Sequence, residues 1–323
     1  MSDFNKTFRL EVCRIAGMSY IDQERLSRAE GCLWLSARVL ERRRFEHLFR
    51  GGPAAPVVDA LRAYQTPDGG FAHGIEPDYR GPVSQPLNVD FALRILAELP
   101  QPDAGLLRDS VRYLKSITVG DGGVPNMLPS VRAYPRAPWW QPASDTPPGS
   151  LLPTAGFAGL LYAFKVDDPW LTGVSAFCWQ QLARLLERAA RASERIDRLT
   201  VMYEARALMT FLDNTPDRKR AETATAELGR SLMAAKLIQV EPNAATEVAQ
   251  PLEFATTPDS LAARWFEPQV FEAHLDAWVN AQQEHGGWNV PWMMFTPAVE
   301  HEWRGIITLE RLKTLRAWDR FRS

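Results

Sequence analysis

The sequence predicts an all-α protein whose helices form an outer and an inner layer around a closed ring. Helical runs that end at a pair of glycines alternate with more apolar helices, and no run of residues demands a β-strand. The glycine pairs begin at residues 69, 122 and 286, so the second interval is about three times the first. Such spacing is typical of repeat architectures. A closed array of 323 residues can form one domain, and we expect a single domain over residues 1–323.

The first predicted helices are those before residue 125. Leu33, Ala37 and Leu40 repeat at helical spacing, and Gly51-Gly52-Pro53 is a stop signal, which predicts one helix over 29–49. The next helices are predicted at 57–65, 84–98 and 103–116. Before them, residues 1–25 are mixed in character and are interpreted as an N-terminal arm.

The later helices are predicted at 151–164, 170–190, 196–212, 217–235, 260–266, 271–283 and 297–321. The first of these is apolar nearly all round and should be buried, and Pro297 suits the first turn of the last one. The proline-rich stretch 125–150 also holds aromatic residues, which are scarce in solvated linkers, so it is interpreted as a rim or lid of the ring.

The charge balance excludes an electrostatic case for nucleic acid as a partner. The chain has 37 Lys and Arg against 39 Asp and Glu, a net charge of −2. Two charged groups, Arg42-Arg43-Arg44 and the row Asp90, Arg94 and Glu98, are expected to face solvent as parts of helix surfaces. The sequence does not predict an oligomeric state.

The cysteine pattern favours a reducing compartment. Cys13, Cys32 and Cys178 have no CxxC spacing, which argues against a disulfide framework or a zinc ribbon. The first residues lack the apolar core of a signal peptide, and the longest apolar stretch, 151–164, is too short to span a bilayer. We therefore expect a cytoplasmic protein without a transmembrane segment.

The glycine-pair turns resemble the QW repeats of squalene and other terpenoid cyclases, and the similar turns of protein prenyltransferases. The matching residues are Gln65, Gly69 and Phe71 near the start, and Gln282 or Gln283, Gly286 and Trp288 near the end. The copy at residues 121–124 lacks both the glutamine and the aromatic residue. The resemblance implies an α/α toroid of about five to six helical hairpins around a central cavity.

The acidic motifs of these families are absent from the chain. It contains neither the Asp-x-Asp-Asp acid motif nor the metal-binding Asp-Asp-x-x-Asp motif, so the resemblance implies a divergent member. Cys178, His274 and Asp276 are candidates for a prenyltransferase-like zinc site, but their spacing has no specificity. The sequence therefore predicts no metal and no cofactor.

Candidate catalytic residues gather in two segments that a closed ring would bring together. Glu76 and Asp78, with His73, lie in a loop at 72–82, and Glu300 and Glu302 lie at the start of the last helix. Carboxyl groups with aromatic neighbours can hold a proton at neutral pH and suit acid and base chemistry. The helix dipole also favours acidic side chains near a helix N-terminus, so the positions of Glu300 and Glu302 can be explained without a catalytic role.

Aromatic and basic residues near these segments are candidates for substrate binding. Aromatic rings can stack on a flat ligand or stabilise a cation, and arginines can bind an anion or pair with the acids. The candidates are Trp288, Trp292, Phe295, Trp303, Trp139, Trp140, Arg80 and Arg304.

Three functions are compatible with these residues. The first is a terpene-cyclase-like enzyme that cyclises or isomerises a hydrophobic small molecule, an isoprenoid, by acid and base chemistry. The second is an α/α-barrel glycosidase or polysaccharide lyase, since two carboxylates and tryptophan platforms also suit sugars. The third is a toroid that binds a small molecule without catalysis. The fold alone does not decide among them.

Overall fold

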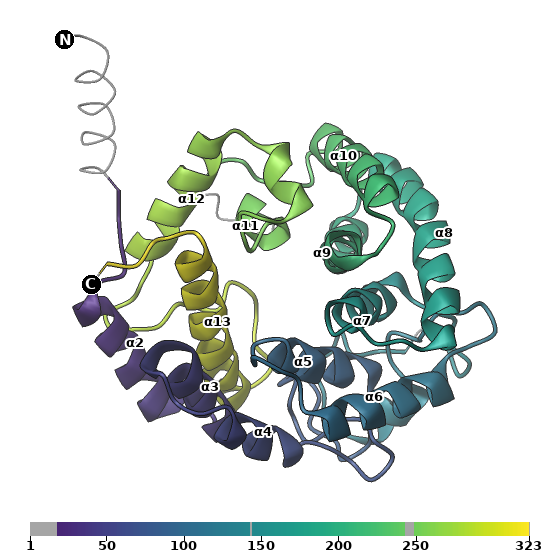
Figure 1. The fold of residues 1–323 in the computed structure, drawn as a ribbon, viewed down its shortest axis with the longest axis horizontal. Helices are drawn as coiled ribbons and strands as arrows, with labels where there is room; N and C mark the ends of the chain where they lie inside the picture. Colours follow the sequence, from purple (N-terminus) through teal and green to yellow (C-terminus); the bar gives the residue numbers. More distant parts are fainter. Residues whose placement is uncertain (1–17, 143, 243–248, 323) are drawn as a thin grey trace.

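The computed structural model describes residues 18–142, 144–242 and 249–322, and these form an all-helical ring (Figure 1). Within these ranges there are twelve α-helices and two short 3₁₀ helices and no β-strand, which confirms the predicted fold class. The 3₁₀ helices are η1 (Pro129–Ala133) and η2 (Leu261–Trp265).

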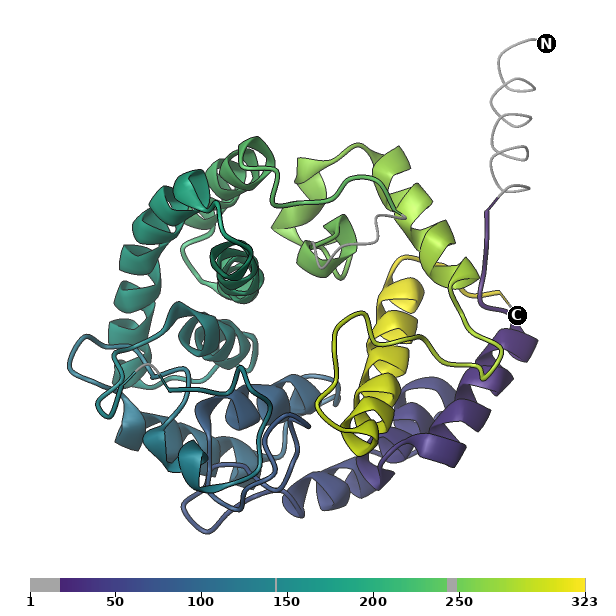
Figure 2. The same cartoon turned by 180° about the vertical axis from the view of Figure 1, so that it is seen from behind.

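Most helices alternate between an outer and an inner circle (Figures 1 and 2). The outer circle consists of α2 (Gln23–Ser36), α4 (Ala55–Arg62), α6 (Ala104–Ile117), α8 (Pro169–Arg191), α10 (Arg218–Ala234) and α12 (Pro268–Asn280). The inner circle consists of α5 (Pro86–Leu96), α7 (Leu151–Ala163), α9 (Arg195–Asn214), α11 (Pro251–Phe254) and α13 (Pro297–Ala317). Helix α3 (Val39–Arg50) packs against α2, α4 and α13. Helix α7 is buried nearly all round, as its composition predicts.

The single helix predicted over 29–49 is wrong, because the chain breaks into α2 and α3. Ala37 and Arg38 have extended backbone conformations and end the first helix. Arg42 Nε donates to the carbonyl of Ala37 at 3.0 Å, which satisfies one carbonyl at the end of α2. The Arg38 side chain is drawn into contacts with Glu41 and with the loop at 74–75. Local apolar spacing cannot reveal such a break, because both helices keep the same period.

The three glycine-pair turns share one backbone geometry. In each turn the residue three positions before the first glycine donates its N–H to the second glycine's carbonyl, and its own carbonyl accepts from the first glycine's N–H. The pairs of bonds measure 3.0 and 3.0 Å at Thr66, 2.9 and 2.9 Å at Val119, and 2.9 and 2.9 Å at Gln283. The first glycine has a positive φ in all three, 92°, 87° and 90° at Gly69, Gly122 and Gly286.

A buried polar side chain of the following inner helix holds the residue after each turn. Asn88 of α5 donates to the carbonyl of Phe71 at 3.0 Å, and Thr154 of α7 accepts from the N–H of Val124 at 2.9 Å. Thr308 of α13 accepts from the N–H of Trp288 at 3.4 Å. All three polar side chains are fully buried, so each turn is tied to its own inner helix by a bond that water does not replace.

Each first glycine also lies against the backbone of another outer helix. A Cβ atom at Gly69 would lie 2.5 Å from the carbonyl oxygen of Asp109 in α6, and one at Gly122 would lie 3.3 Å from Gly173 in α8. A Cβ atom at Gly286 would lie 2.0 Å from the carbonyl oxygen of Arg28 in α2. The third turn therefore closes the ring by joining its end to its beginning.

The shared geometry decides which glutamine belongs to the last turn. Counting from the glycines, Gln282 is the equivalent of Gln65, and Gln283 is one position later. Gln282 Nε2 donates to the carbonyls of Arg25 at 2.9 Å and Gly286 at 2.7 Å, so it joins α2 to this turn.

The two ends of the described chain strengthen the closure. Ile21 donates to the carbonyl of Arg320 at 2.8 Å and accepts from the N–H of Arg322 at 3.0 Å. The backbone N–H of Ser19 donates to Asp276 of α12 at 2.8 Å. The part of the predicted N-terminal arm that is described thus docks on the last hairpin, while residues 1–17 lie outside the described ranges.

A charge network that is buried at Arg44, Glu41 and Glu98 and reaches the surface at Glu310 joins α3, the residues just after α5, and α13. Arg44 contacts Glu98 and Glu310 at 2.6 Å each, and Lys313 contacts the same two carboxylates at 2.6 and 2.8 Å. Glu41 lies 3.7 Å from Arg44 and 2.8 Å from Arg38. Three cations therefore face three carboxylates. Burial alone would raise the pKa of Glu98, but Arg44 and Lys313 outweigh it and hold that pKa below its usual range.

This network corrects two expectations about helix surfaces. Arg44 is only 2% exposed and the Glu98 side chain only 5%, so neither faces solvent. Charged residues this deep require partners from other helices, and those partners lie 54 and 266 positions away from Arg44 in the chain. Among the described helices, none is long and apolar enough to cross a membrane.

The close approach at Gly286 predicts a strong effect of one methyl group. We expect Gly286→Ala to lower the free energy of unfolding by about 2–4 kcal/mol, because alanine disfavours the positive φ and would overlap the Arg28 carbonyl. Chemical denaturation measures the change. Gly120→Ala is the matched control, because nothing lies within 4 Å of its Cβ position. Equal stability of the two variants would show that the turn does not close the ring.

The charge network predicts a loss of stability on removal of one carboxylate. Glu98→Gln leaves Arg44 buried with fewer partners, and we expect a loss of about 3–5 kcal/mol, whereas Glu227→Gln on the exposed face of α10 should change the value by less than about 0.5 kcal/mol. Burial alone would raise the pKa of Glu98, but Arg44 and Lys313 outweigh it and lower that pKa. A depressed folded pKa stabilises the fold above the unfolded pKa, so the contribution of Glu98 should be lost as pH falls below about 4.3 and through the folded pKa. A Glu98→Gln variant whose acid unfolding matches the wild type would contradict this.

Candidate active site

The candidate site lies where three loops meet on the ring face from which the inner helices begin. Long segments precede α5, α7 and α13 on this face (Figure 2). The loop 72–82 is joined to the rim segment by two backbone bonds, Arg80 N–H to Pro135 O at 3.0 Å and Ala137 N–H to Asp78 O at 2.8 Å. The loop therefore has fixed neighbours although it has no helix or strand of its own.

Arg38 binds the backbone of the loop 72–82 just before its acidic residues. Its guanidinium donates to the carbonyl oxygens of Gly74 and, at 3.0 Å, Ile75. The same guanidinium donates two parallel hydrogen bonds, of 2.8 Å each, to the carboxylate of Glu41. This bidentate contact fixes the orientation of the guanidinium. The acidic sequence Glu76-Pro77-Asp78 follows directly after Gly74 and Ile75 in the chain. Sequence reasoning missed Arg38 because it resembles any other helix arginine.

Both carboxylate oxygens of Asp78 accept hydrogen bonds from indole N–H groups. Trp139 of the rim segment donates to one oxygen at 2.8 Å, and Trp303 of α13 donates to the other at 2.9 Å. Asp78 is 4% exposed. Burial raises its pKa, and the two indole donors only partly oppose the rise. Asp78 thus joins three segments, the most distant of them 225 positions away.

Of the two carboxyl groups, Glu76 has the pKa that is raised further above its usual range. Its Oε2 accepts the backbone N–H of Asp78 at 2.9 Å, and its side chain is half-buried. Burial raises the pKa of Glu76 well above its usual range, and the nearby Asp78 carboxyl adds to the rise. Backbone N–H groups and Arg38 oppose the rise without cancelling it. Glu76 therefore retains a proton at pH values where an exposed glutamate has lost it.

Further aromatic rings lie around Trp303, one of the two tryptophans that bind Asp78. Trp303 contacts Trp292 edge to face at 5.2 Å and Phe91 of α5 at 6.1 Å between ring centroids. Trp292, Trp303 and Phe91 are all half-buried, so part of each ring remains open. Phe295 packs against a second aromatic group in which Tyr79 stacks on Trp140 at 5.3 Å.

The charged residues at the start of α13 reach back to the loop. Arg80 forms an ion pair with Glu302, across 222 positions of sequence. Arg304 pairs with Glu300 at 2.7 Å within the helix and lies 3.4 Å from His301. The expected meeting of the first and last units is thus present at Glu302.

Not every candidate residue lies with this group. Trp288 is 1% exposed and donates its indole N–H to the carbonyl of Trp278 at 2.7 Å, so it lies in the core and is left out of the site. Trp140 is 2% exposed and supports Tyr79 from inside. His73 is exposed at the edge of the loop. Glu300 faces Arg304, and no contact joins it to Glu76 among the residues described.

The residues named for a zinc site do not come together. His274 Nε2 contacts the carbonyl of Val240 at 2.7 Å, Asp276 accepts from Ser19, and Cys178 is buried in the core. Within the described ranges, no group of three or more His, Cys, Asp and Glu side chains could hold a metal ion. Cys32 and Cys178 are free thiols, and Cys13 lies outside these ranges.

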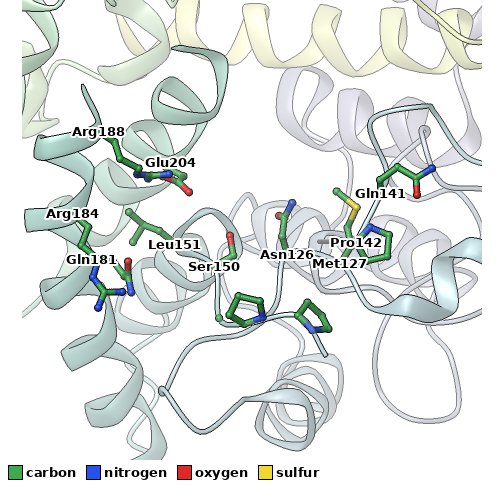
Figure 3. Close-up of a pocket in the computed structure, with 13 residues that line it drawn as sticks. Asn126, Met127, Gln141, Pro142, Ser150, Leu151, Gln181, Arg184, Arg188 and Glu204 are labelled. Atoms are coloured by element: carbon green, nitrogen blue, oxygen red, sulfur yellow. The ribbon is translucent and has the colours of Figure 1, made fainter. Parts of the chain in front are cut away.

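A second feature of the same face escaped sequence reasoning. A pocket of about 410 Å³ opens between the rim segment, the start of α7, the C-terminal half of α8 and the middle of α9 (Figure 3). Its polar lining includes Asn126, Ser150, Gln181 and Arg184. The only signal in the sequence was the unusual stretch 125–150, which marked the rim but not its neighbours on α8.

Comparison with known proteins identifies the fold but no family. No family model matches the chain, and no curated protein matches it either. A solved protein from Actinoplanes superposes with a TM-score of 0.55 and 16% identity over 91% of this chain and 98% of that one, so the two chains share a fold. The type II terpene cyclase MstE from Scytonema is also similar, without ligand at a TM-score of 0.49, 13% identity, and 92% and 99% coverage of the two chains. A variant of it in complex with geranylgeranyl dihydroxybenzoate gives 0.48, 14%, 90% and 95%.

The raised pKa of Glu76 predicts a specific pH dependence of stability. A raised folded pKa stabilises the fold fully below the unfolded value of about 4.3, and the contribution is lost as pH rises through the folded pKa. Glu76→Gln removes this loss, so the variant should gain stability relative to the wild type as pH rises above about 4.3. Unfolding free energies from denaturant titration at several pH values test this. Parallel pH curves for wild type and Glu76→Gln would contradict it, and Glu227→Gln is the control.

Proposed function

We propose that this protein is an enzyme that protonates an unsaturated hydrophobic small molecule, an isoprenoid, and thereby starts its cyclisation or isomerisation at the Glu76–Asp78 site. The observation that supports it is the geometry around Glu76: a half-buried carboxyl beside a second carboxyl that two tryptophans hold in place. A carboxylic acid whose pKa is raised by burial and by a second carboxyl group can act as a general acid.

Glu76 is the proton donor in this proposal. Its proton adds to one carbon of a double bond, so a C–H bond forms and a cation develops on the neighbouring carbon. Asp78 is the positioning residue, because its bonds to Trp139 and Trp303 hold the loop while its carboxyl keeps the pKa of Glu76 high.

Aromatic rings stabilise the cation until a proton leaves. Trp292, Trp303 and Phe91 present partly open rings, and aromatic faces attract cations. Loss of a proton from a carbon next to the cation to Glu302, which reaches the loop at Arg80, forms a new double bond. Glu302 then releases this proton to water. The reaction rearranges the substrate without net oxidation or reduction, and water returns a proton to Glu76.

Sugar chemistry is less well supported by the same geometry. A glycosidase needs two carboxyl groups on opposite sides of one bond, with one of them free to act as base or nucleophile. Both oxygens of Asp78 are already bound by indole N–H groups, and Glu76 and Asp78 belong to one short loop. A ligand-binding protein without catalysis remains distinguishable by experiment.

The decisive experiment measures product formation from linear isoprenoids and their terminal epoxides by gas chromatography and mass spectrometry. We expect turnover by the wild type, a rate that falls as pH rises through the pKa of Glu76, and at least a hundredfold loss in Glu76→Gln. Glu227→Gln should retain full activity, and circular dichroism verifies folding.

Other outcomes would redirect the assignment. Equal rates for Glu76→Gln and wild type would remove Glu76 from the mechanism. Turnover of oligosaccharides instead of isoprenoids would overturn the proposal in favour of the glycosidase or lyase. Binding of isoprenoids that never yields product would indicate the non-catalytic toroid.

A further inference from the structure

The pocket of Figure 3 has a charged wall on α8 and α9. Gln181, Arg184 and Arg188 come from α8, and Glu204 comes from α9. Arg188 is paired with Glu204, whose side chain is only 11% exposed, so these two charges offset each other. Among the described residues Arg184 has no ion-pair partner, and its side chain is exposed to the pocket. The pocket therefore holds one guanidinium that is available for an anion.

The opposite wall supplies hydrogen-bonding groups and apolar surface. Asn126 and, at the far end, Gln141 each carry a side-chain amide NH2 group, which can donate hydrogen bonds to an anion. Met127, Leu151 and three prolines complete the lining. A purely hydrophobic ligand would leave the amides and Arg184 unsatisfied, whereas a ligand with a charged head and an apolar tail satisfies both kinds of surface.

The start of α7 lies at the floor of the pocket. Ser150 precedes this 13-residue helix, lines the pocket, and makes no capping bond to the helix with its side chain. The positive end of the helix dipole and the Ser150 hydroxyl both favour an anion in this position. They add to the charge of Arg184, which is the principal anion-binding group here.

The pocket and the Glu76–Asp78 site are neighbours. Trp139 donates to Asp78, while Gln141, two residues later, lines the pocket. Two residues span at most about 7 Å. Met127 lines the pocket and also packs in the cluster of Tyr79 and Trp140. The same rim segment thus contributes residues to both the pocket and the Glu76–Asp78 site.

We propose that this pocket binds the anionic headgroup, a carboxylate or a phosphate, of an amphiphilic substrate whose unsaturated chain extends to the Glu76–Asp78 site. The inference rests on the proposed function for the fate of the chain, but the headgroup site can be tested without turnover. Arg184 is the residue that contacts the headgroup.

Isothermal titration calorimetry with three matched ten-carbon isoprenoids tests the headgroup site. Geranic acid carries a carboxylate, geranyl phosphate a phosphate, and geraniol a neutral hydroxyl. We expect the wild type to bind at least one of the two anions about tenfold or more tightly than geraniol, and whichever binds more tightly identifies the headgroup. Arg184→Gln should weaken the binding of that anion about tenfold and leave geraniol unchanged.

Two further variants make the result decisive. Arg191→Gln removes an exposed arginine at the end of the same helix that does not line the pocket, and it should change the affinity less than twofold. Glu76→Gln should bind the anions as the wild type does, even where it loses turnover. Geraniol binding as tightly as both anions, or equal losses in Arg184→Gln and Arg191→Gln, would overturn the headgroup site and leave the acid chemistry untouched. Failure of the acid chemistry alone would leave the Arg184 effect in place.

Discussion

The structure depends on the contact between each glycine-pair turn and the backbone of another outer helix. At Gly69, Gly122 and Gly286 the positive φ turns the chain inward, and the missing side chain lets the turn approach a carbonyl or backbone atom of α6, α8 or α2. A buried polar residue then ties the turn to its inner helix. These two contacts set both the radial position of the inner helix and its distance from the next unit, and the last of them converts a row of hairpins into a ring.

Ring closure is what assembles the candidate site. Asp78 and Trp303 are far apart in sequence, yet their side chains bond because α13 returns beside the first units. The indole donors have two effects at once: they hold the loop in place, and they bind the Asp78 carboxylate without giving it a full opposite charge. Burial and the nearby Asp78 carboxyl therefore both raise the pKa of Glu76. The positive charge of Arg38 opposes this rise only in part.

The distribution of charge around the ring separates two regions. Between α3, α5 and α13 the inner side of the first and last units is filled by a balanced network of arginine, lysine and glutamate. Two groups of aromatic residues, one around Trp303 and one around Tyr79, lie instead among the loops of the candidate site.

The sequence by itself determined the helical class, the position of most helices and the turns that organise them, because apolar periodicity and glycine pairs are local signals. It also named Glu76, Asp78, Glu302, Trp139, Trp303 and Arg80 as candidates, since unusual loops and helix starts mark such residues. Only the tertiary structure decided that Trp288 lies in the core, that Arg44 and Glu98 are buried partners, and that α2 and α3 are separate helices. It alone placed Arg38 under the loop and Arg184 in a pocket. Burial and pairing depend on residues hundreds of positions apart, and no local pattern encodes which of them meet when the ring closes.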